Sequence, residues 1–197
     1  MTPSTTLTPG ARRILEVASA LFYERGIHAV GVDTIAAESG VTKRTLYDRF
    51  GSKDALVVAY LAERDRRWRD RVVAALDAAP ADPPARVDAV FEVLAAWTAE
   101  SGRGCSFINA AAEFPDPDHP ARTLVREEKQ WLRERFVDAL AGVPDAERVA
   151  ETLLLLHEGA FVVLSAAQDP DAVAQARRAA RSLVESVVGT GPHDPQP

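Results

Sequence analysis

A chain of 197 residues, of which 47% are hydrophobic, is long enough to bury a core, and this excludes a wholly disordered protein. The single cysteine excludes an internal disulfide, and the polar start, Met1 to Gly10, lacks the basic and apolar segments of a secretory signal, so we expect a cytoplasmic protein. The formal net charge of −6 argues against a chain that is basic throughout, as a general nucleic-acid binder would be.

The predicted secondary structure is helical. Apolar residues recur at three- and four-residue spacing, and sustained alternation of polar and apolar residues is missing, so the sequence favours an all-α fold. The first helix is predicted to start near Pro9 and to stop at Gly26. The residues that we expect to form a three-helix core over the first fifty positions are Ile14, Leu15, Ala18, Leu21, Phe22, Val32, Ile35, Ala36, Val41, Leu46 and Phe50.

Residues 31–50 predict two short helices joined at Gly40, with Thr42 and two basic residues opening the second helix. A helix-turn-helix docks its second helix by the N-terminal end, where backbone N–H groups and short polar side chains meet phosphates and base edges. Between Val41 and Lys53 the sequence has four basic residues and one acidic residue. The positive charge that DNA binding requires is therefore concentrated at this helix.

A long helix is predicted to follow the N-cap residue Ser52 and to continue to about Ala79, a length of about 40 Å. Further helices lie between breaks rich in proline and glycine and bring the expected total to nine; their ranges are 85–101, 105–114, 121–141, 145–168 and 171–188. The three segments that we expect are a helix-turn-helix DNA-binding domain over 8–56, a larger helical domain over 57–188, and a disordered tail over 189–197.

An ordered set of short motifs runs through the first sixty residues. It consists of Glu24-Arg25-Gly26 after an amphipathic helix, Ile35-Ala36, Gly40-Val41-Thr42, Thr45-Leu46-Tyr47, Phe50, and Lys53 with Leu56. This set resembles the TetR family of transcriptional regulators. The rest of the chain resembles the family's variable C-terminal domain more loosely, which implies a ligand-binding and dimerisation domain over 57–188. The resemblance implies a homodimeric repressor that leaves its double-stranded operator DNA when a small-molecule effector binds. An activator would have the same sequence features.

Each residue at the start of the second, recognition helix has an expected role. Thr42 should cap the helix by accepting a hydrogen bond from a backbone N–H near Arg44 or Thr45. Lys43 and Arg44 can reach guanine edges or phosphates, and Thr45 can touch a thymine methyl group or a phosphate. The resemblance implies further contacts with the DNA backbone, by Tyr47, Arg49 and Lys53.

Two positions depart from the family's pattern. Gly31 stands where a threonine or serine often caps the second helix, and Asp33 stands where a basic DNA contact is sometimes found. Asp33 would be repelled by phosphate unless it caps or pairs, and Thr34 is the remaining DNA contact that we carry over. Asp48 is expected to pair with Arg44, four residues earlier, rather than to read a cytosine.

The C-terminal two thirds contains candidates for an effector site. Asn109 and Glu113 lie one helical turn apart in an otherwise apolar segment, where they could orient a ligand, although Asn109 could equally satisfy backbone groups in a packed core. Other residues could line the same cavity or be ordinary core; these are Phe91, Leu94, Trp97, Cys105, Phe107, Trp131, His157 and Phe161. A moderately hydrophobic effector is expected, of unknown identity.

Reactive and metal-binding groups are sparse. Cys105 has no lysine or histidine beside it in the sequence, so an inert buried thiol is expected rather than a redox sensor. The acidic residues and histidine of loop 115–120 lack the spacing of a zinc site, and we expect no metal and no cofactor. His157 and Glu158 form either a buried hydrogen-bonded pair, a dimer-interface feature or a ligand anchor.

The helix expected over 145–168 is apolar on nearly all sides, as a peripheral helix of a monomer cannot be. We expect it to form a four-helix dimer interface with the helix 171–188, a buried central helix in a monomer being the alternative. Its most apolar part, Leu153–Ala167, is shorter than the about 20 residues that a membrane span needs. It also contains His157 and Glu158, so no membrane partner is expected.

Two other functions compete with a regulator. A helical enzyme could use His157 and Glu158, or Cys105, on a small molecule, but the sequence has no nucleophile-elbow, phosphate-binding or two-metal motif. A helical adaptor would leave the cluster between Thr42 and Lys53 unexplained. The sequence therefore favours a non-enzymatic, DNA-binding transcriptional regulator.

Overall fold

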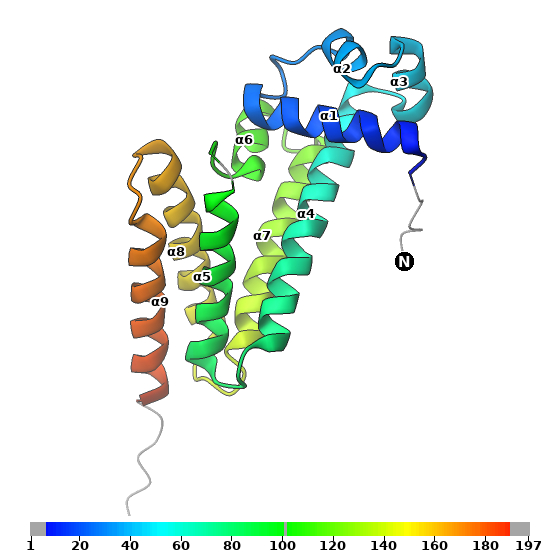
Figure 1. Cartoon of the computed structure of the whole chain (residues 1–197). Helices are drawn as coiled ribbons and strands as arrows, with labels where there is room; N and C mark the ends of the chain where they lie inside the picture. The colour runs from blue at the N-terminus through cyan, green and yellow to red at the C-terminus, as the bar shows by residue number, and fades with distance from the viewer. Residues whose placement is uncertain (1–6, 101, 190–197) are drawn as a thin grey trace, which may run out of the picture. The chain divides into compact units, whose positions relative to one another are not determined.

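The computed structural model describes residues 7–100 and 102–189, and all regular structure within these residues is α-helical (Figure 1). In chain order the helices are α1 (Pro9–Arg25), α2 (Val32–Ser39), α3 (Lys43–Phe50), α4 (Lys53–Ala78), α5 (Pro83–Ala99), α6 (Ser106–Glu113), α7 (Pro120–Ala139), α8 (Ala146–Ala166) and α9 (Ala172–Gly189). The prediction of an all-α fold with nine helices is confirmed for the described part of the chain. Of the expected disordered tail, Gly189 instead ends α9, and residues 190–197 lie outside the described residues.

The chain forms two compact units that do not follow the expected boundary at residue 56. The N-terminal unit combines the residues up to Arg66 with Ser106–Val125, and the C-terminal unit combines Arg67–Cys105 with the residues from Arg126 onward. The first half of α4 belongs to the N-terminal unit because its apolar face is buried there; the Tyr60 ring, for example, lies 5.8 Å from that of Phe22. The expected domains, 8–56 and 57–188, divide the chain by function and not by compactness, and they stay a prediction.

The N-terminal unit is built around α1, α2 and α3, which pack against one another. Helix α1 begins where predicted because Thr8 Oγ1 accepts a hydrogen bond from the Ala11 N–H at 3.3 Å and a proline occupies the first turn. Most of the expected core residues of these helices are buried, and Val32, Val41 and Phe50 are half-buried. The three-helix core is therefore present as the apolar spacing predicted.

The turn between α2 and α3 depends on Gly40, whose φ of 70° lies in the left-handed region. A residue with a Cβ is disfavoured in this conformation, whereas glycine adopts it readily and closes α2 through its own N–H. Ser39, which is buried beside it, receives the Arg13 Nε–H on its carbonyl oxygen at 2.9 Å. Side chains of α1 thus fix the angle at which the chain enters α3.

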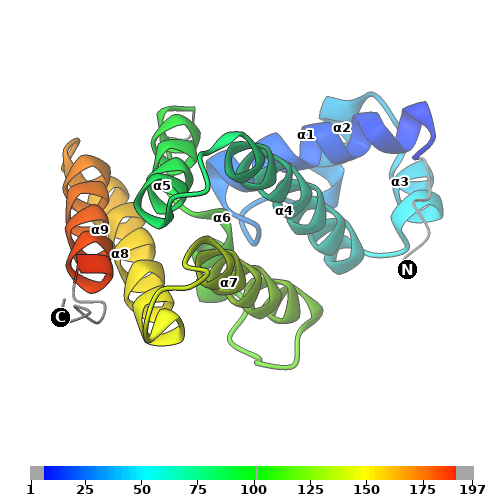
Figure 2. The same cartoon turned by 90° about the horizontal axis from the view of Figure 1, so that it is seen from below.

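In the C-terminal unit α8 and α9 lie side by side, and α5 packs against both (Figures 1 and 2). The apolar residues at helical spacing along α5 are all buried; these are Val87, Val90, Phe91, Leu94 and Trp97. Helix α5 begins two residues earlier than expected because Asp82 caps it, accepting from the Ala85 N–H at 3.1 Å, and Pro83 and Pro84 suit its first turn.

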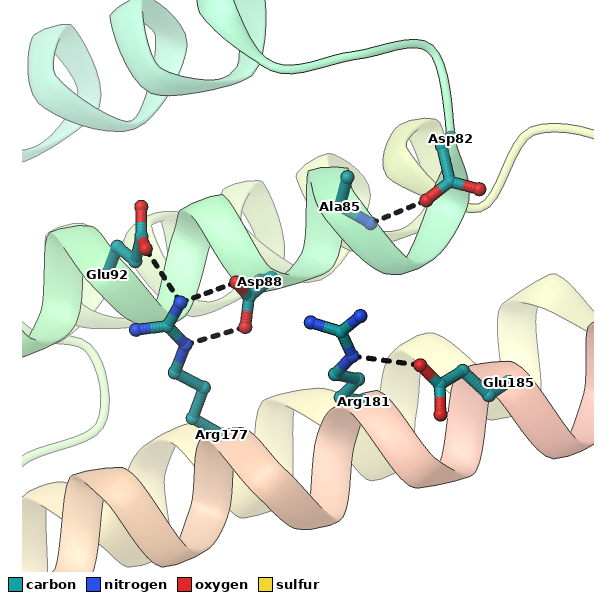
Figure 3. A network of polar contacts seen from close by, with 7 residues as sticks. All are labelled: Asp82, Ala85, Asp88, Glu92, Arg177, Arg181 and Glu185. Atoms are coloured by element: carbon teal, nitrogen blue, oxygen red, sulfur yellow. Dashed lines mark hydrogen bonds and ion pairs between the residues drawn. The ribbon is translucent and has the colours of Figure 1, made fainter.

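A clasp of ion pairs joins α5 to α9 (Figure 3). Arg177 donates through Nε and Nη2 to the two carboxylate oxygens of Asp88, at 2.6 and 2.5 Å, and through Nη2 to Glu92 at 2.6 Å. The Arg177 hydrogen bonds hold the pKa of Asp88 below its ordinary value. Two parallel N–H···O bonds to one carboxylate fix orientation as well as distance, so the clasp sets how α9 lies along α5.

We expect Asp88→Asn to lower the free energy of unfolding at neutral pH by about 1–2 kcal/mol, because it removes a charge-assisted pair of bonds. Since the folded pKa of Asp88 is depressed, its contribution is complete above the ordinary pKa, about 3.9, and is lost as the pH falls through the folded value. Urea unfolding at pH 7 and at pH 3 should therefore show a difference between wild type and variant that shrinks in acid. Asp77→Asn, at an exposed position on α4, is the control; an effect of equal size there would contradict the assignment.

Helix α8 begins at Ala146, before the most apolar stretch of the sequence, which starts at Leu153. With 21 residues and a mean hydropathy of 1.5 over its most apolar window, it is long and apolar enough to cross a membrane by those criteria alone. About a third of that window is buried within the chain, through residues such as Leu153, Ala160 and Phe161 that pack inside the C-terminal unit. The pattern is consistent with a core helix of a soluble protein.

Candidate functional site

The first turn of α3 is organised by Thr42 as predicted. Its Oγ1 accepts the Thr45 N–H at 3.1 Å and lies 2.9 Å from the Thr45 Oγ1. This cap satisfies one of the unpaired N–H groups of the helix and leaves the others at the exposed end of α3. The recognition helix therefore presents its N-terminal end, with Lys43 and Arg44, on the surface of the N-terminal unit.

Both acidic residues near the recognition helix are paired. Asp33, at the departure from the family's pattern, lies 3.1 Å from Lys43 Nζ, and Asp48 lies 3.9 Å from Arg44 Nε, as predicted for that pair. The Arg44 side chain is 92% exposed, so the pair with Asp48 is worth little and leaves the guanidinium open to an incoming anion. Lys43 must leave Asp33, or share it, before it can contact a phosphate.

The other predicted DNA contacts lie in the same unit with different exposures. Tyr47 and Arg49 are exposed on α3, whereas Thr34 on α2 is half-buried. Gly31, before α2, provides no side-chain cap. Lys53 opens α4 and is half-buried; burial lowers its pKa, while the charges of Glu113 and Asp54 oppose the shift. All of the predicted DNA contacts lie in the N-terminal unit and stay predictions; they are Thr34, Thr42, Lys43, Arg44, Thr45, Tyr47, Arg49 and Lys53.

The contacts of Glu113 differ from the expected ones. Its carboxylate accepts the backbone N–H groups of Ile27 and His28, at 2.9 and 2.6 Å, and lies 3.1 Å from His28 Nδ1. Burial opposes ionisation, but these hydrogen bonds hold the pKa of Glu113 below its ordinary value. Glu113 therefore fastens the end of α6 to the loop between α1 and α2. Because both carboxylate oxygens are occupied, a role in orienting a ligand is disfavoured.

We expect Glu113→Gln to lower the free energy of unfolding by about 1–2 kcal/mol, because an amide has one acceptor oxygen where two N–H groups require one each. Urea denaturation measures the change. Glu127→Gln alters an exposed glutamate on α7 in the same way and should leave the stability within about 0.5 kcal/mol of wild type. Equal losses in the two variants would show that the loop contact contributes nothing.

The predicted effector-site residues are divided between the units. Phe107, Asn109 and Glu113 belong to the N-terminal unit; the members in the C-terminal unit are Phe91, Leu94, Trp97, Cys105, Trp131, His157 and Phe161. Trp131 is only half-buried, and the guanidinium groups of Arg69 and Arg135 lie over its ring at 4.9 and 5.5 Å. The ligand-binding residues therefore stay predicted. Of these residues, Phe91 and Phe161 lie close to His157.

His157 is the centre of an aromatic cluster. Its ring centroid lies 5.9 Å from that of Phe161 and 6.1 Å from that of Phe91, and two rings that sequence reasoning did not place there, Trp68 and Phe136, lie at 5.6 and 6.4 Å. His157 is 2% exposed. Trp68 lies in a highly charged stretch of α4, and its spacing to Val72 and Leu76, all three of them buried, is the signal that could have found it.

A polar network adjoins this cluster. Glu158 lies 3.1 Å from His157 Nδ1 and 2.8 Å from Lys129 Nζ, which is also 2.8 Å from Glu128 and donates to Cys105 Sγ at 3.8 Å. No lysine lies beside Cys105 in the sequence, but α7 brings Lys129 there from 24 residues away. Sequence reasoning also missed Glu128, which is 3% exposed although the sequence around it is highly charged.

Burial affects the charged members of this network differently. It opposes ionisation of Glu158, yet the His157 hydrogen bond and the Lys129 charge lower the pKa of Glu158 to about 2. Burial also disfavours the Lys129 ammonium, but the acidic groups around it, Cys105, Glu128 and Glu158, raise its pKa. Glu128, for which burial dominates, has a raised pKa. Lys129 and Glu158 are therefore ionised at neutral pH, inside a unit whose core is otherwise apolar.

A cleft of about 290 Å³ opens on the C-terminal unit beside the same cluster. Its lining residues are Thr98, Gly102, Gly104, Phe161, Leu164, Ser165, Gln168 and Pro170. Gly104 is required here, since a Cβ at this position would approach the Ser165 hydroxyl oxygen to 2.7 Å. Phe161 is shared between the cleft and the ring cluster around His157. Among the described residues no group of three histidine, cysteine or acidic side chains is arranged to hold a metal ion.

A fold that is all-helical over the described residues, with a capped recognition helix that exposes a basic first turn, defines a helix-turn-helix DNA-binding regulator. Residues 14–60 match the family described as bacterial regulatory proteins, tetR family, and residues 83–180 match the tetracyclin repressor-like C-terminal domain. The chain therefore belongs to the TetR family and is a DNA-binding transcriptional regulator, as predicted. Members of this family bind operator DNA and small-molecule effectors, act as dimers and are typically not enzymes.

Similar proteins match over most of the chain. A TetR-family transcriptional regulator from Streptomyces coelicolor is 35% identical, with 90% of this chain and 95% of that chain covered and a TM-score of 0.84. A TetR-type regulator from Streptomyces avermitilis is 27% identical, with 92% and 99% covered and a TM-score of 0.78. The HTH-type transcriptional regulator BetI of Rhizobium meliloti is 29% identical over 175 residues, which are 81% of this chain and 80% of that protein.

Proposed function

We propose that the protein is a homodimeric repressor that leaves its operator when a small molecule binds the C-terminal unit. The observation that carries the DNA-binding part is α3, with a capped N-terminal end and the exposed guanidinium of Arg44 in its first turn. Repression is supported by similarity to DhaR of Mycobacterium, named a repressor, over 127 residues. The likeness to FasR, named an activator, covers only 49 residues.

Dimerisation is proposed through α8 and α9. Along α8 the residues at positions 155, 159, 162 and 166 recur at helical spacing and are all exposed. Two of them are large and apolar: Leu155 is 73% exposed and Val162 is 44% exposed. An apolar stripe of this kind is costly in water and is typical of a helix that packs against a second copy.

The proposed response to the effector is a population shift. Two recognition helices can enter successive major grooves only when they are about 34–36 Å apart. An effector that binds more tightly to dimers with a different spacing releases the operator. Helix α4 is suited to transmit the change, because it runs without interruption from Lys53, a predicted DNA contact, to Ala78 and so passes the boundary between the units at Arg66. Glu113, at the end of α6, supplies a second connection to the DNA-reading part through the α1–α2 loop.

Fluorescence anisotropy tests the proposal. The full chain is titrated against labelled DNA from upstream of its own gene and against scrambled DNA of the same length, at two salt concentrations. We expect selective binding of two chains per site, with an affinity that falls with salt by a slope of about 0.9 per phosphate contact. Weak binding that is equal on both sequences and disappears with salt would contradict an operator upstream of the gene.

A further inference from the structure

Among the buried polar atoms of the C-terminal unit that have no hydrogen-bond partner in the protein, two lie on neighbouring aromatic rings. They are Nε1 of Trp68 and Nε2 of His157, whose residues are 4% and 2% exposed. The two rings are neighbours, with centroids 5.6 Å apart. Buried polar atoms in native proteins are almost always paired, so two unpaired atoms on adjacent rings indicate a place where a bound molecule supplies the partners.

The two atoms have complementary hydrogen-bonding roles. An indole Nε1–H can only donate. The His157 ring faces the Glu158 carboxylate through Nδ1 at 3.1 Å, and because Glu158 is ionised it can only accept, so Nδ1 of His157 carries the proton. In a neutral imidazole that is protonated on Nδ1, Nε2 presents a lone pair. A hydroxyl group accepts one hydrogen bond and donates another, and it therefore matches a neighbouring donor and acceptor.

The surroundings favour a molecule that is otherwise apolar and carries no charge. Phe91, Phe136 and Phe161 surround the His157 ring, and Trp97 packs against Trp68 with ring centroids 5.5 Å apart. In the adjoining network the Lys129 ammonium lies between the carboxyl groups of Glu128 and Glu158, each 2.8 Å away. Its charge is balanced there, so this network offers an anionic ligand no net attraction.

We infer that the C-terminal unit binds a neutral, mainly apolar molecule whose hydroxyl group accepts a hydrogen bond from Trp68 Nε1 and donates one to His157 Nε2. The inference rests on the proposed function, since this molecule would be the effector. The cleft of about 290 Å³ provides the route, because Phe161 lines the cleft and also packs against His157. Entry from the cleft displaces the Phe161 ring on α8, the helix proposed to form the dimer interface.

Calorimetric titration of the full chain with matched probes tests the inference. The hydroxyl probes are 2-naphthol and 4-propylphenol, and each is compared with its methyl ether, which has the same apolar body but cannot donate. We expect each hydroxyl probe that binds to do so at least about tenfold more tightly than its ether, because the ether leaves Nε2 of His157 unpaired. Equal affinities within both pairs would overturn the inference.

Variants locate the hydroxyl group. Trp68→Phe keeps an aromatic ring and removes the N–H, and we expect it to lose most of the affinity for the hydroxyl probe. Tyr60→Phe removes a polar group from a buried aromatic ring of the N-terminal unit, outside the proposed site, and should retain that affinity. Thermal melting with and without the probe reports folding in the same samples, so a variant that fails to fold is recognised. His157→Phe then serves as the second variant, with the same expected loss.

Charged probes and DNA binding separate the possible failures. Tighter binding of decanoate or of tetraethylammonium than of either hydroxyl probe would replace the inference with a charged ligand. Absence of binding by every probe would show that the two atoms are satisfied by buried water alone, which also overturns it. Operator binding by the protein without probes is measured separately. Selective DNA binding without a preference for the hydroxyl probes would support the proposed function and contradict the ligand site. A preference for the hydroxyl probes without DNA binding would support the ligand site and contradict the proposed function.

Discussion

Leu155→Glu is expected to convert the proposed dimer of 21.3 kDa chains to monomers and to reduce operator affinity by about 10²- to 10⁴-fold. Leu155 is 73% exposed on α8, and a carboxylate at this position would have to be buried without a partner when two copies pack together. The loss in DNA binding is large because each chain has one recognition helix. A monomer loses the second half-site and with it the advantage of bivalent binding. Sedimentation velocity and anisotropy on the same preparation measure the two effects.

The chain provides a matched pair of controls for this result. Val162 and Val73 are both large, apolar and similarly exposed, at 44% and 40%, but Val162 lies in the α8 stripe and Val73 lies on α4. Val162→Glu should weaken the dimer as Leu155→Glu does. Val73→Glu should leave both the mass of the assembly in solution and the operator affinity unchanged. A dimer that survives Leu155→Glu and Val162→Glu would place the interface elsewhere on the chain.

Arg44→Ala is expected to reduce operator affinity by about 1–3 kcal/mol per chain while leaving affinity for scrambled DNA much less affected. The reason is the position of Arg44 in the first turn of α3, where its side chain is 92% exposed and only weakly held by Asp48 at 3.9 Å. A guanidinium there can form two parallel hydrogen bonds with a guanine edge. Anisotropy titrations give the ratio of the affinities for operator and scrambled DNA, and a fall in this ratio would support base contact by Arg44.

Lys53→Ala is expected to behave differently. As a predicted phosphate contact, Lys53 should contribute equally on all sequences, so its removal should lower both affinities and reduce the salt slope by about 0.9. Arg44→Lys is the control for Arg44, since it keeps the charge but loses the two-bond geometry; it should keep the salt slope and lose selectivity. Equal losses on operator and scrambled DNA for Arg44→Ala would refute base reading by that residue.

Much of the fold could be predicted because its signals are local in sequence. The spacing of Ile14, Phe22, Ile35 and Leu46 follows the period of a helix with one buried face, and all four are buried. Helix ends were predicted from capping residues such as Thr42, whose hydrogen bond to Thr45 forms within four residues. The identification of the recognition helix rested on the same short-range signals.

The contacts of the candidate effector residues could not be predicted in this way. Asn109 and Glu113 were chosen because they lie one turn apart in an apolar helix, but spacing within a helix does not show which element faces it. The carboxylate of Glu113 is paired with the backbone of Ile27, 86 residues earlier. Trp68 and Glu128 were missed for a related reason, because both lie in highly charged sequence whose buried side is visible only after packing.

The sequence by itself determined the nine helices of the described residues, the turn at Gly40, the basic first turn of α3 and the membership of the TetR family, since each depends on residues a few positions apart. Only the tertiary structure decided that Lys129 lies between Glu128 and Glu158 beside Cys105, and that Trp68 and His157 are neighbours with unpaired nitrogen atoms. These arrangements join helices that are distant in the chain. Their partners are set by how the apolar faces pack, and the periodicity of a single helix carries no information about which face it will meet.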